Sequence, residues 1–386
     1  MKNLYLLIKP SHRAKLISFV IFIGLLPGFT AVAQERYSIN GTVKDEKGLT
    51  LPGATVFLTG TKIITTCDVE GQFHLDKVSP GSYELVAKMI GFTSQTVPVI
   101  LKNNSLTLNL TLKTKVNSLN EVTISFDPNW NDHYAQFKQK FLGTTPNSGE
   151  CKILNPNILH FHYSKRSKNL SATAEDFIII ENDALGYKIS YLLNNFEYND
   201  STHIVKYQGS PSFQEMTPKS DKQLAYWKKN RETAYHGSVT HFLKSVYDGD
   251  EYKQGFEVYK IINKPPPGVP YTDDKPIFFD QHRILFDSLL TVTDKNFKSL
   301  TYKHCLFVVY VKERESLHIK DSGYQIARPK GSQVPNGQFS MVNLMDASVS
   351  IDSNGNFSDP GGLLFEGYMG WEQIADLTPL EYGKEK

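Results

Sequence analysis

Between Tyr37 and Leu112 the sequence alternates apolar and polar residues, and turn residues interrupt the alternation at short intervals. Successive side chains of a β-strand point to opposite faces, so this period of two predicts strands with one buried face. Many short strands separated by regularly spaced turns are typical of a sandwich of two sheets. We therefore expect residues 35–115 to form an antiparallel β-sandwich of seven strands.

Five short motifs follow one another within this stretch. They are Ile39–Val43 (INGTV), Leu51–Val56 (LPGATV), Asp68–Phe73 (DVEGQF), Pro80–Tyr83 (PGSY) and Ile90–Phe92 (IGF). In this order they resemble the carboxypeptidase-like regulatory domain, an Ig/transthyretin-like sandwich also found ahead of TonB-dependent outer-membrane receptors. Leu119–Ile124 resembles the linker that follows the module in those receptors. The resemblance implies an accessory module.

Glycines recur where this pattern turns. Gly41, Gly53, Gly71 and Gly81 are expected at turns or at close contacts between strands, because only glycine lacks the side chain that would clash there. Cys67 stands where the family more often has a small polar residue, and no chemistry is inferred from it.

The N-terminus has the three parts of a secretory signal. A basic region to Lys15 precedes the apolar run Leu16–Leu26, and Ala31–Ala33 supplies small residues before Gln34. Eleven helical residues rise about 16 Å, less than a hydrocarbon core of about 30 Å, which argues against the alternative of a retained anchor. We expect residues 1–33 to be a signal peptide and the mature protein to have no transmembrane span. The expected location is the periplasm, the outer membrane or the cell surface.

The charge balance and the cysteine count restrict the possible ligands and disulfides. Without the four basic residues of the N-terminal region, 38 basic and 40 acidic residues remain, and such a balance predicts no nucleic-acid binding. Cys67, Cys151 and Cys305 are too few for a disulfide framework. We expect buried thiols, with a Cys151–Cys305 disulfide as the alternative.

After an expected linker at residues 116–126, residues 127–386 are predicted to form an α+β domain with an antiparallel sheet and an inserted helical pair. Asp127 and Pro128 read as the start of a helix that ends at Gly143. Helical spacing returns at about 220–247, broken at Gly237–Ser238. Strands are expected at Ile158–Tyr163, Asp176–Glu181, Gly186–Leu192, His203–Tyr207, 255–262, 301–312 and 340–351.

This half resembles the C-terminal part of uncharacterised envelope proteins that carry the same N-terminal module. The residues that carry the resemblance are Asn155-Pro156, Leu185–Lys188, Tyr226-Trp227, Asn230-Arg231, Tyr235, Gly237-Ser238, His241–Leu243 and Gly370–Glu372. The resemblance implies no activity.

Motifs for metal or nucleophilic catalysis are absent from the sequence. None of the eleven histidines has Glu three residues later, and there is no HExxH, so the metallocarboxypeptidase zinc site is not encoded. His160 and His162 share one face of an expected strand but have no identifiable third ligand. Asp352–Asn356 resembles the start of a calcium loop without its distal Glu and is predicted to be a hairpin turn. We expect no cofactor and no metal.

One group of side chains has the composition of a ligand site. Trp227, Arg231, Tyr235 and His241 combine aromatic rings with a guanidinium, which can hold an anionic or sugar ligand. Packing of the rings in the core around a buried Arg is the simpler interpretation. The sequence thus favours a non-enzymatic binding or assembly module of the cell envelope, with an envelope protein or a glycan as its partner. The alternatives are a hydrolase in residues 127–386, or carbohydrate binding by exposed aromatic side chains of the sandwich.

Overall fold

The computed structural model describes residues 36–115, 127–265, 277–303, 305–321, 337–359 and 361–383, without the side chains of Phe279, Gln281, Lys320 and Asp321. The expected signal peptide and the 116–126 linker lie outside these ranges. No helix in them combines the length and apolar character needed to cross a membrane.

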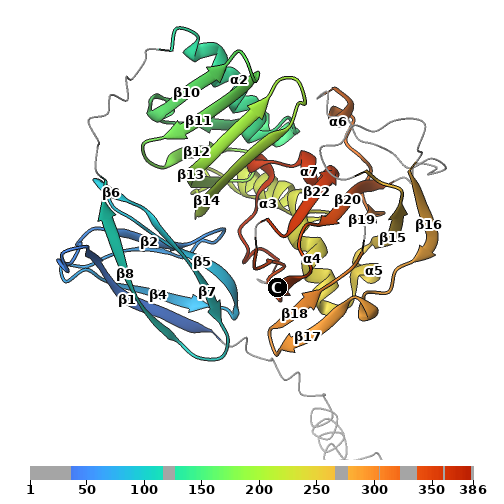
Figure 1. Cartoon of the computed structure of the whole chain (residues 1–386), viewed down its shortest axis with the longest axis horizontal. Helices are drawn as coiled ribbons and strands as arrows, with labels where there is room; N and C mark the ends of the chain where they lie inside the picture. The colour runs from blue at the N-terminus through green and yellow to red at the C-terminus, as the bar shows by residue number, and fades with distance from the viewer. Residues whose placement is uncertain are drawn as a thin grey trace, which may run out of the picture. The chain divides into compact units, whose positions relative to one another are not determined.

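The N-terminal alternation folds into two four-stranded sheets, and the predicted sandwich is confirmed (Figure 1). The sheets have the orders β4-β1-β8-β6 and β3-β2-β5-β7. There are eight strands rather than seven, because β3 and β6 are too short to show an alternation. The strands are β1 (Tyr37–Asp45), β2 (Thr55–Leu58), β3 (Ile64–Thr66), β4 (Gln72–Val78), β5 (Gly81–Lys88), β6 (Phe92–Thr93), β7 (Gln95–Leu101) and β8 (Leu106–Thr114).

One strand pair corrects the expectation of a wholly antiparallel sandwich. The first and last strands, β1 and β8, lie side by side and run parallel from Ile39–Leu106 to Asp45–Leu112. They can do so because a chain crossover, and not a hairpin, joins them. A Cβ on Gly41 would lie 1.6 Å from the carbonyl oxygen of Leu108, so this close pairing requires glycine.

A second, six-stranded antiparallel sheet follows. Its order is β10-β11-β13-β12-β9, with β14 paired to β13. Helix α2 (Trp130–Leu142) buries Phe137 and Phe141 against one face of this sheet. The strands are β9 (Cys151–Ile153), β10 (Leu159–Ser164), β11 (Asn169–Ala174), β12 (Ile178–Asn182), β13 (Tyr187–Asn199) and β14 (Val205–Glu215), with 3-10 turns η1 (Pro146–Glu150) and η2 (Pro156–Ile158).

The expected start of α2 is wrong by two residues. Asn129, not Asp127, is the N-cap, because Asp127 and Pro128 form a turn before the helix. The Asp127 carboxylate still stabilises this turn, since it accepts the Asn129 N–H at 3.0 Å and binds His133 Nδ1 at 2.6 Å. Gly143 ends the helix as predicted.

The predicted helical pair is present, with its break at the predicted place. Helix α3 (Asp221–Tyr235) and helix α4 (Val239–Asp248) meet at Gly237, where φ is +81°. Ser220 and Ser238 cap the two N-termini, their hydroxyls accepting the N–H groups of Gln223 and His241 at 3.2 Å each. A short helix α5 (Glu251–Gln254) follows.

The last part is a five-stranded sheet, β16-β15-β19-β20-β22, and a three-stranded sheet, β17-β18-β21. The strand expected at 340–351 is two strands in different sheets, because exposed residues 345–348 separate them. The bounds are β15 (Phe256–Ile262), β16 (Phe278–Arg283), β17 (Leu290–Asp294), β18 (Phe297–Leu300), β19 (Cys305–Tyr310), β20 (Gln338–Leu344), β21 (Val349–Asp352), β22 (Leu363–Gly367), α6 (His318–Asp321), α7 (Tyr368–Trp371), η3 (Phe286–Ser288) and η4 (Ile374–Asp376).

The sandwich packs against the sheet that follows it, within one compact unit that begins at Arg36. Gly60 N–H donates to the carbonyl of Pro211 at 2.7 Å, and Phe213 N–H donates to the carbonyl of Thr61 at 3.0 Å. The hairpin between β2 and β3 therefore covers the outer edge of β14, which would otherwise expose unpaired backbone groups.

Candidate functional site

Helix α3 is fastened to the turn between β12 and β13 by two of the residues that carry the C-terminal resemblance. Trp227 is buried, and its Nε1 donates to the carbonyl of Asp183 at 2.7 Å. Asn230 Nδ2 donates to the carbonyl of Ala184 at 3.0 Å. A Cβ on Gly186 would lie 2.2 Å from the indole, so this turn and the tryptophan fit one another only with glycine present.

Arg231 continues the same attachment. Its Nε donates to the carbonyl of Leu185 at 2.6 Å and its Nη2 to that of Gly186 at 3.1 Å. The guanidinium also lies over the ring of Tyr187, 3.9 Å from the centroid. Together with Trp227 and Asn230, it bonds to four successive carbonyl groups, of which that of Gly186 also accepts the Met216 N–H at 3.0 Å.

Tyr235 and His241 belong to a neighbouring aromatic cluster. Their ring centroids are 4.9 Å apart, and His241 lies 4.9 Å from Phe256. The N–H of Gly237 donates to Nδ1 of His241 at 3.1 Å. Burial lowers the pKa of His241 to about 4, so its ring is neutral at neutral pH. The contacts thus divide the four candidate residues between two clusters, and a ligand shared by all four stays a prediction.

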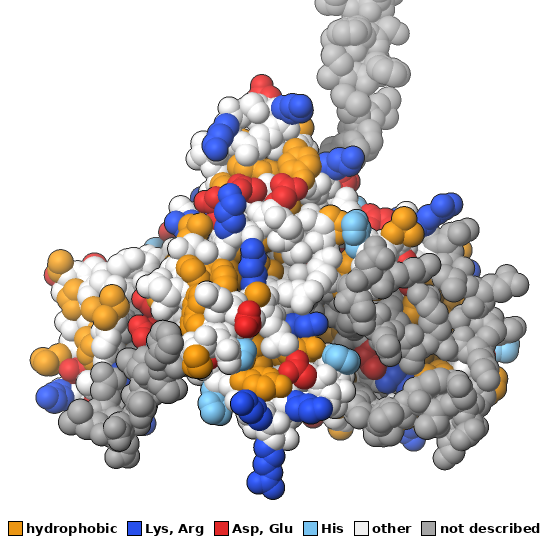
Figure 2. All heavy atoms as spheres, turned by 90° about the horizontal axis from the view of Figure 1, so that it is seen from above, with side chains coloured by type: hydrophobic (Ala, Val, Ile, Leu, Met, Phe, Trp, Pro, Cys, Tyr) orange, Lys and Arg blue, Asp and Glu red, His pale blue; other side chains and the backbone are white. Residues whose placement is uncertain are grey.

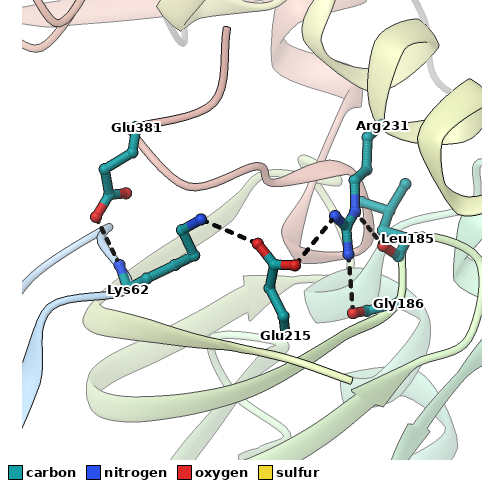
Figure 3. Close-up of polar contacts among 6 residues, drawn as sticks. All are labelled: Lys62, Leu185, Gly186, Glu215, Arg231 and Glu381. Atoms are coloured by element: carbon teal, nitrogen blue, oxygen red, sulfur yellow. Dashed lines mark hydrogen bonds and ion pairs between the residues drawn. The ribbon is translucent and has the colours of Figure 1, made fainter. Parts of the chain in front are cut away.

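A charged row leads from Arg231 to the sandwich (Figure 3). Arg231 Nη1 lies 3.7 Å from Glu215 Oε2, and Glu215 Oε1 accepts from Lys62 Nζ at 2.9 Å. Burial alone would raise the pKa of Glu215, but the hydrogen bond and charge of Lys62, with the charge of Arg231, lower it overall. Glu215 therefore stays ionised and joins β14 to the β2–β3 hairpin.

Lys62 also lines a groove of about 410 Å³ at the open edge of the sandwich. This groove lies where β3 and β4, the edge strands of the two sheets, meet the C-terminal segment. Its largely apolar lining residues include Ile63, Leu75, Tyr83 and Leu380, and its acidic, basic and imidazole side chains are Arg36, Lys62, His74, Asp76, Lys77 and Glu381. An apolar lining with a few charged groups is the usual composition of a binding site.

A β-bulge shapes one wall of this groove. Asp76 and Lys77 lie opposite the single residue Ser38 of β1, and Lys77 has a φ of +58°. A bulge of this kind turns consecutive side chains outward at a sheet edge. Asp76 pairs with His74 at 2.6 Å, whereas Arg36 and Lys77 form no ion pair with any residue in the described ranges.

The opposite wall is the edge of β3. The two residues that flank β3 bond inward, since the Leu58 N–H donates to the Ile63 carbonyl at 3.0 Å and the Cys67 N–H donates to the Ala54 carbonyl at 2.8 Å. Because the pairing of an antiparallel ladder alternates, the N–H and C=O groups of Ile64 and Thr66 point away from β2. No strand within the described ranges pairs with them, since β3 is the last strand of its sheet.

The C-terminal segment already pairs with the residues that lead into β3. The N–H of Leu380 donates to the carbonyl of Gly60 at 2.9 Å, and the N–H of Lys62 donates to Glu381 Oε1 at 2.9 Å. The Leu380 side chain packs against the core of the sandwich. Leu380 and Glu381 lie in a turn closed by the Tyr382 N–H and the Pro379 carbonyl at 2.8 Å, and they are held at one end of the groove by backbone, apolar and carboxylate contacts.

A second attachment of the sandwich comes from the loop after β21. Asp352 Oδ2 accepts the N–H of Ser82 at 2.7 Å. Asn354 Nδ2 donates to the carbonyl of Pro80 and to the hydroxyl of Tyr83, both at 3.1 Å. Residues 352–356 form the predicted turn, but the side chains of Asp352 and Asn354 are buried against the sandwich, which the turn pattern alone did not indicate.

The three cysteines lie outside the groove and are buried thiols, as expected. Cys67, Cys151 and Cys305 are all free and buried, so the alternative of a Cys151–Cys305 disulfide is wrong. Burial raises the pKa of Cys67 to about 11 and that of Cys151 and Cys305 to about 12 each, which makes them weak nucleophiles.

The two histidines of β10 have separate neighbours. His160 Nε2 bonds to Glu175 Oε1 at 2.7 Å, and His162 lies exposed on the same strand. Among the described residues no group of three or more His, Cys, Asp or Glu side chains is placed to hold a metal ion.

The end of the sandwich farthest from these attachments exposes apolar loops. Leu49, Val69 and Ile90 have exposed fractions of 64%, 78% and 81%. No aromatic side chain of residues 36–115 is among the large exposed apolar ones, so the row required for carbohydrate stacking is missing there. On the face drawn in Figure 2 basic and acidic side chains are interspersed, which does not favour a nucleic-acid surface.

Residues 39–124 match the family described as CarboxypepD_reg-like domain, so the N-terminal module of the chain is a domain of this type. The TonB-dependent receptor P39 of Formosa agariphila shares it, with 33% identity over 109 residues. The match spans 28% of this chain and 10% of that receptor. The similarity therefore concerns the N-terminal module, and the rest of the receptor has no counterpart in this match.

Three solved structures show a weaker similarity to this chain. A putative carbohydrate-binding protein from Bacteroides uniformis matches with a TM-score of 0.18 and 11% identity over 41% of this chain and 60% of its own. A cohesin–X-dockerin complex from Acetivibrio cellulolyticus matches with a TM-score of 0.19 and 16% identity over 20% of this chain and 58% of its own. Catechol 1,2-dioxygenase from Pseudomonas arvilla matches with a TM-score of 0.19 and 12% identity over 22% of this chain and 54% of its own. Scores this low carry no argument about this chain.

Proposed function

We propose that the chain is a non-enzymatic module of the bacterial cell envelope that binds an envelope protein or a glycan through the groove between β3, β4 and the C-terminal segment. The groove is the observation that carries the proposal. It combines an apolar lining, two cations without an ion pair in the described ranges, and open backbone groups at one edge of the family-matched domain.

The attachments of the sandwich support a binding role. The groove is lined both by the sandwich and by Leu380 and Glu381, more than 260 residues further along the chain. Lys62, Glu215 and Arg231 join the sandwich to β14 and α3 in a charged row, and the Lys62 N–H joins it to Glu381. A site with fixed walls loses less conformational entropy when it binds its ligand.

Export and processing belong to the same proposal. We infer that residues 1–33 are removed, that residues 35–115 form the sandwich domain, and that a linker at 116–126 leads to a domain at 127–386. The intact mass of protein recovered from the periplasm or outer membrane should match a chain beginning at Gln34. A full-length mass would contradict the processing step.

Photo-crosslinking in cells tests the binding site. A photoreactive phenylalanine analogue replaces Thr65 in the groove, Val69 in the distal loops, or Thr173 on β11 as a control. We expect one discrete adduct from Thr65 and none from Thr173. An adduct from Val69 alone would move the site to the distal loops, and no adduct at any of the three positions would contradict a stable binding role.

The hydrolase alternative is tested separately. Protein purified without chelators is assayed for bound zinc and for release of C-terminal residues from peptides. A catalytic zinc needs three protein ligands and an open position, which the sequence does not offer near His160 and His162. Stoichiometric zinc together with hydrolysis, both lost in the His160→Ala/His162→Ala variant, would overturn the non-enzymatic proposal.

A further inference from the structure

We propose that the groove takes an extended acidic peptide segment of a partner protein, which adds as a strand to the outer edge of β3. This inference rests on the proposed binding function and names the chemistry of its ligand. The partner's backbone pairs with Ile64 and Thr66, and its acidic side chains lie near Arg36 and Lys77.

The C-terminal segment already contacts the start of this edge, with Leu380 and Glu381 in a turn and not in a strand. Leu380 and Glu381 pair with Gly60 and Lys62 through one backbone bond and one carboxylate bond, each of 2.9 Å. The backbone groups of Ile64 and Thr66 follow directly along the chain and face the same open edge. A partner strand would therefore continue an interface that the protein already forms with its own chain.

The strand edge favours a peptide over a free small ligand. Native sheets usually protect their edges, and β4 is protected by its bulge and by the polar side chains of His74 and Asp76. Across the groove β3 has no bulge, and Ile64 is 44% exposed. An open edge beside a groove is the arrangement that binds extended peptides in strand addition.

The charges favour an acidic segment. Glu381 and Asp76 are already engaged, by the Lys62 N–H and by His74, whereas Arg36 and Lys77 form no ion pair within the described ranges. A carboxylate brought to either cation forms a charge-assisted contact, and a basic segment meets repulsion. The outward turn of Lys77, produced by the bulge, directs this charge to the rim.

Fluorescence polarisation with the full chain tests the inference. The probe is a blocked, fluorescein-labelled hexapeptide of alternating Val and Glu. Its first control replaces Glu by Lys, and its second carries N-methyl groups on alternate residues, which removes hydrogen-bond donors and leaves the side chains in place. We expect binding of the acidic peptide and affinities at least about tenfold weaker for both controls.

Two variants locate the site. The Arg36→Glu/Lys77→Glu variant should weaken binding of the acidic peptide by about tenfold or more. The Lys113→Glu/Lys115→Glu variant makes the same charge change at the far end of the sandwich and should bind like wild type. Matching thermal unfolding of the two variants confirms that both are folded.

Three outcomes overturn the inference: no binding of the acidic peptide, binding unaffected by N-methylation, or equal losses in the two variants. If one of these occurs while the Thr65 adduct still forms in cells, the proposed function stands and only the peptide inference is lost. If neither the peptide nor the adduct is found, both are wrong.

Discussion

Gly71 lies in the turn between β3 and β4 with a φ of +73° and no room for a side chain. A Cβ there would lie 2.9 Å from both the Val43 carbonyl oxygen and the Thr50 Cβ. Gly48 has a similar φ of +82° but nothing within 4 Å. The pair therefore separates the cost of steric crowding from that of the left-handed backbone.

We expect Gly71→Val to lower the free energy of unfolding by about 3 kcal/mol and Gly48→Val by about 1 kcal/mol. Urea unfolding of the full chain measures both. Equal losses would show that the backbone conformation alone sets the cost and that the crowding around Gly71 is relieved by small shifts.

Individual residues show which roles the sequence could predict. The demands on Gly41 and Gly71 follow from local turn and strand patterns, and the structure confirms them. The partners of Arg231 are carbonyls 45 and 46 residues away, so composition indicated a buried Arg among aromatic rings but could not name the groups it bonds to. The role of Lys77 in the groove could not be predicted from the sequence, because a bulge depends on the register of two strands.

Among the elements, the loop after β21 attaches the last sheets to the sandwich. Asn354 is 1% exposed and donates to the Pro80 carbonyl and the Tyr83 hydroxyl. Its removal leaves these buried acceptors without a donor, which costs more than the hydrogen bonds themselves contribute. Gly81 has no side chain, and a Cβ there would lie 2.1 Å from Asn354 Nδ2.

The Asn354→Ala variant should lose about 2 kcal/mol of stability and exchange the amide hydrogens of β5 faster. The exposed Ser348 on the preceding turn offers a control, and Ser348→Ala should change neither quantity. Unchanged exchange in β5 of Asn354→Ala would show that this attachment contributes little.

The segment around η4 makes the stability of the protein depend on pH. Burial raises the pKa of Asp376 to about 6, although hydrogen bonds from Thr145 and Asn147 oppose the rise. The folded protein thus holds this proton more tightly than the unfolded chain, whose carboxyl has its ordinary pKa. The resulting stabilisation is fully present below about pH 4 and is lost as the pH rises through about 6.

The Asp376→Asn variant lacks this titration. Between about pH 4 and pH 7, the stability of wild type minus that of the variant should fall by about 2 kcal/mol, since each pKa unit corresponds to about 1.4 kcal/mol and the unfolded carboxyl is already partly ionised at pH 4. Urea unfolding at a series of pH values measures the difference. A constant difference would contradict the raised pKa.

The sequence predicts helices and strands best where a hydrophobic period extends over many residues. The sandwich strands, α2 and the α3–α4 pair follow from sustained periods of two or 3.6, and resemblance added the type of domain. Strands of two or three residues, such as β3 and β6, have no period to detect. The groove was missed because its walls come from both ends of the chain and no motif spans them.

As a whole, the protein uses its N-terminal domain as part of a larger body. Phe57 and Val86 on the outer face of the sandwich pack with Leu192 and Phe177 of the next sheet. An excised chain of residues 36–115 would expose this face, and a domain so small buries a modest share of its surface. Calorimetry should show it melting below the full chain; an equal melting temperature would indicate an independent domain.

Hydrogen–deuterium exchange of the full chain with the partner captured at Thr65 tests the binding account most directly. With the partner identified in this way and added without crosslinking, we expect slower exchange confined to β3, β4 and residues 379–383, with the amides of Ile64 and Thr66 among the most protected, and a partner recovered with unchanged mass. Protection at the loops of Leu49, Val69 and Ile90 with none at β3, or a partner recovered in cleaved form, would contradict a non-enzymatic module that binds through the groove.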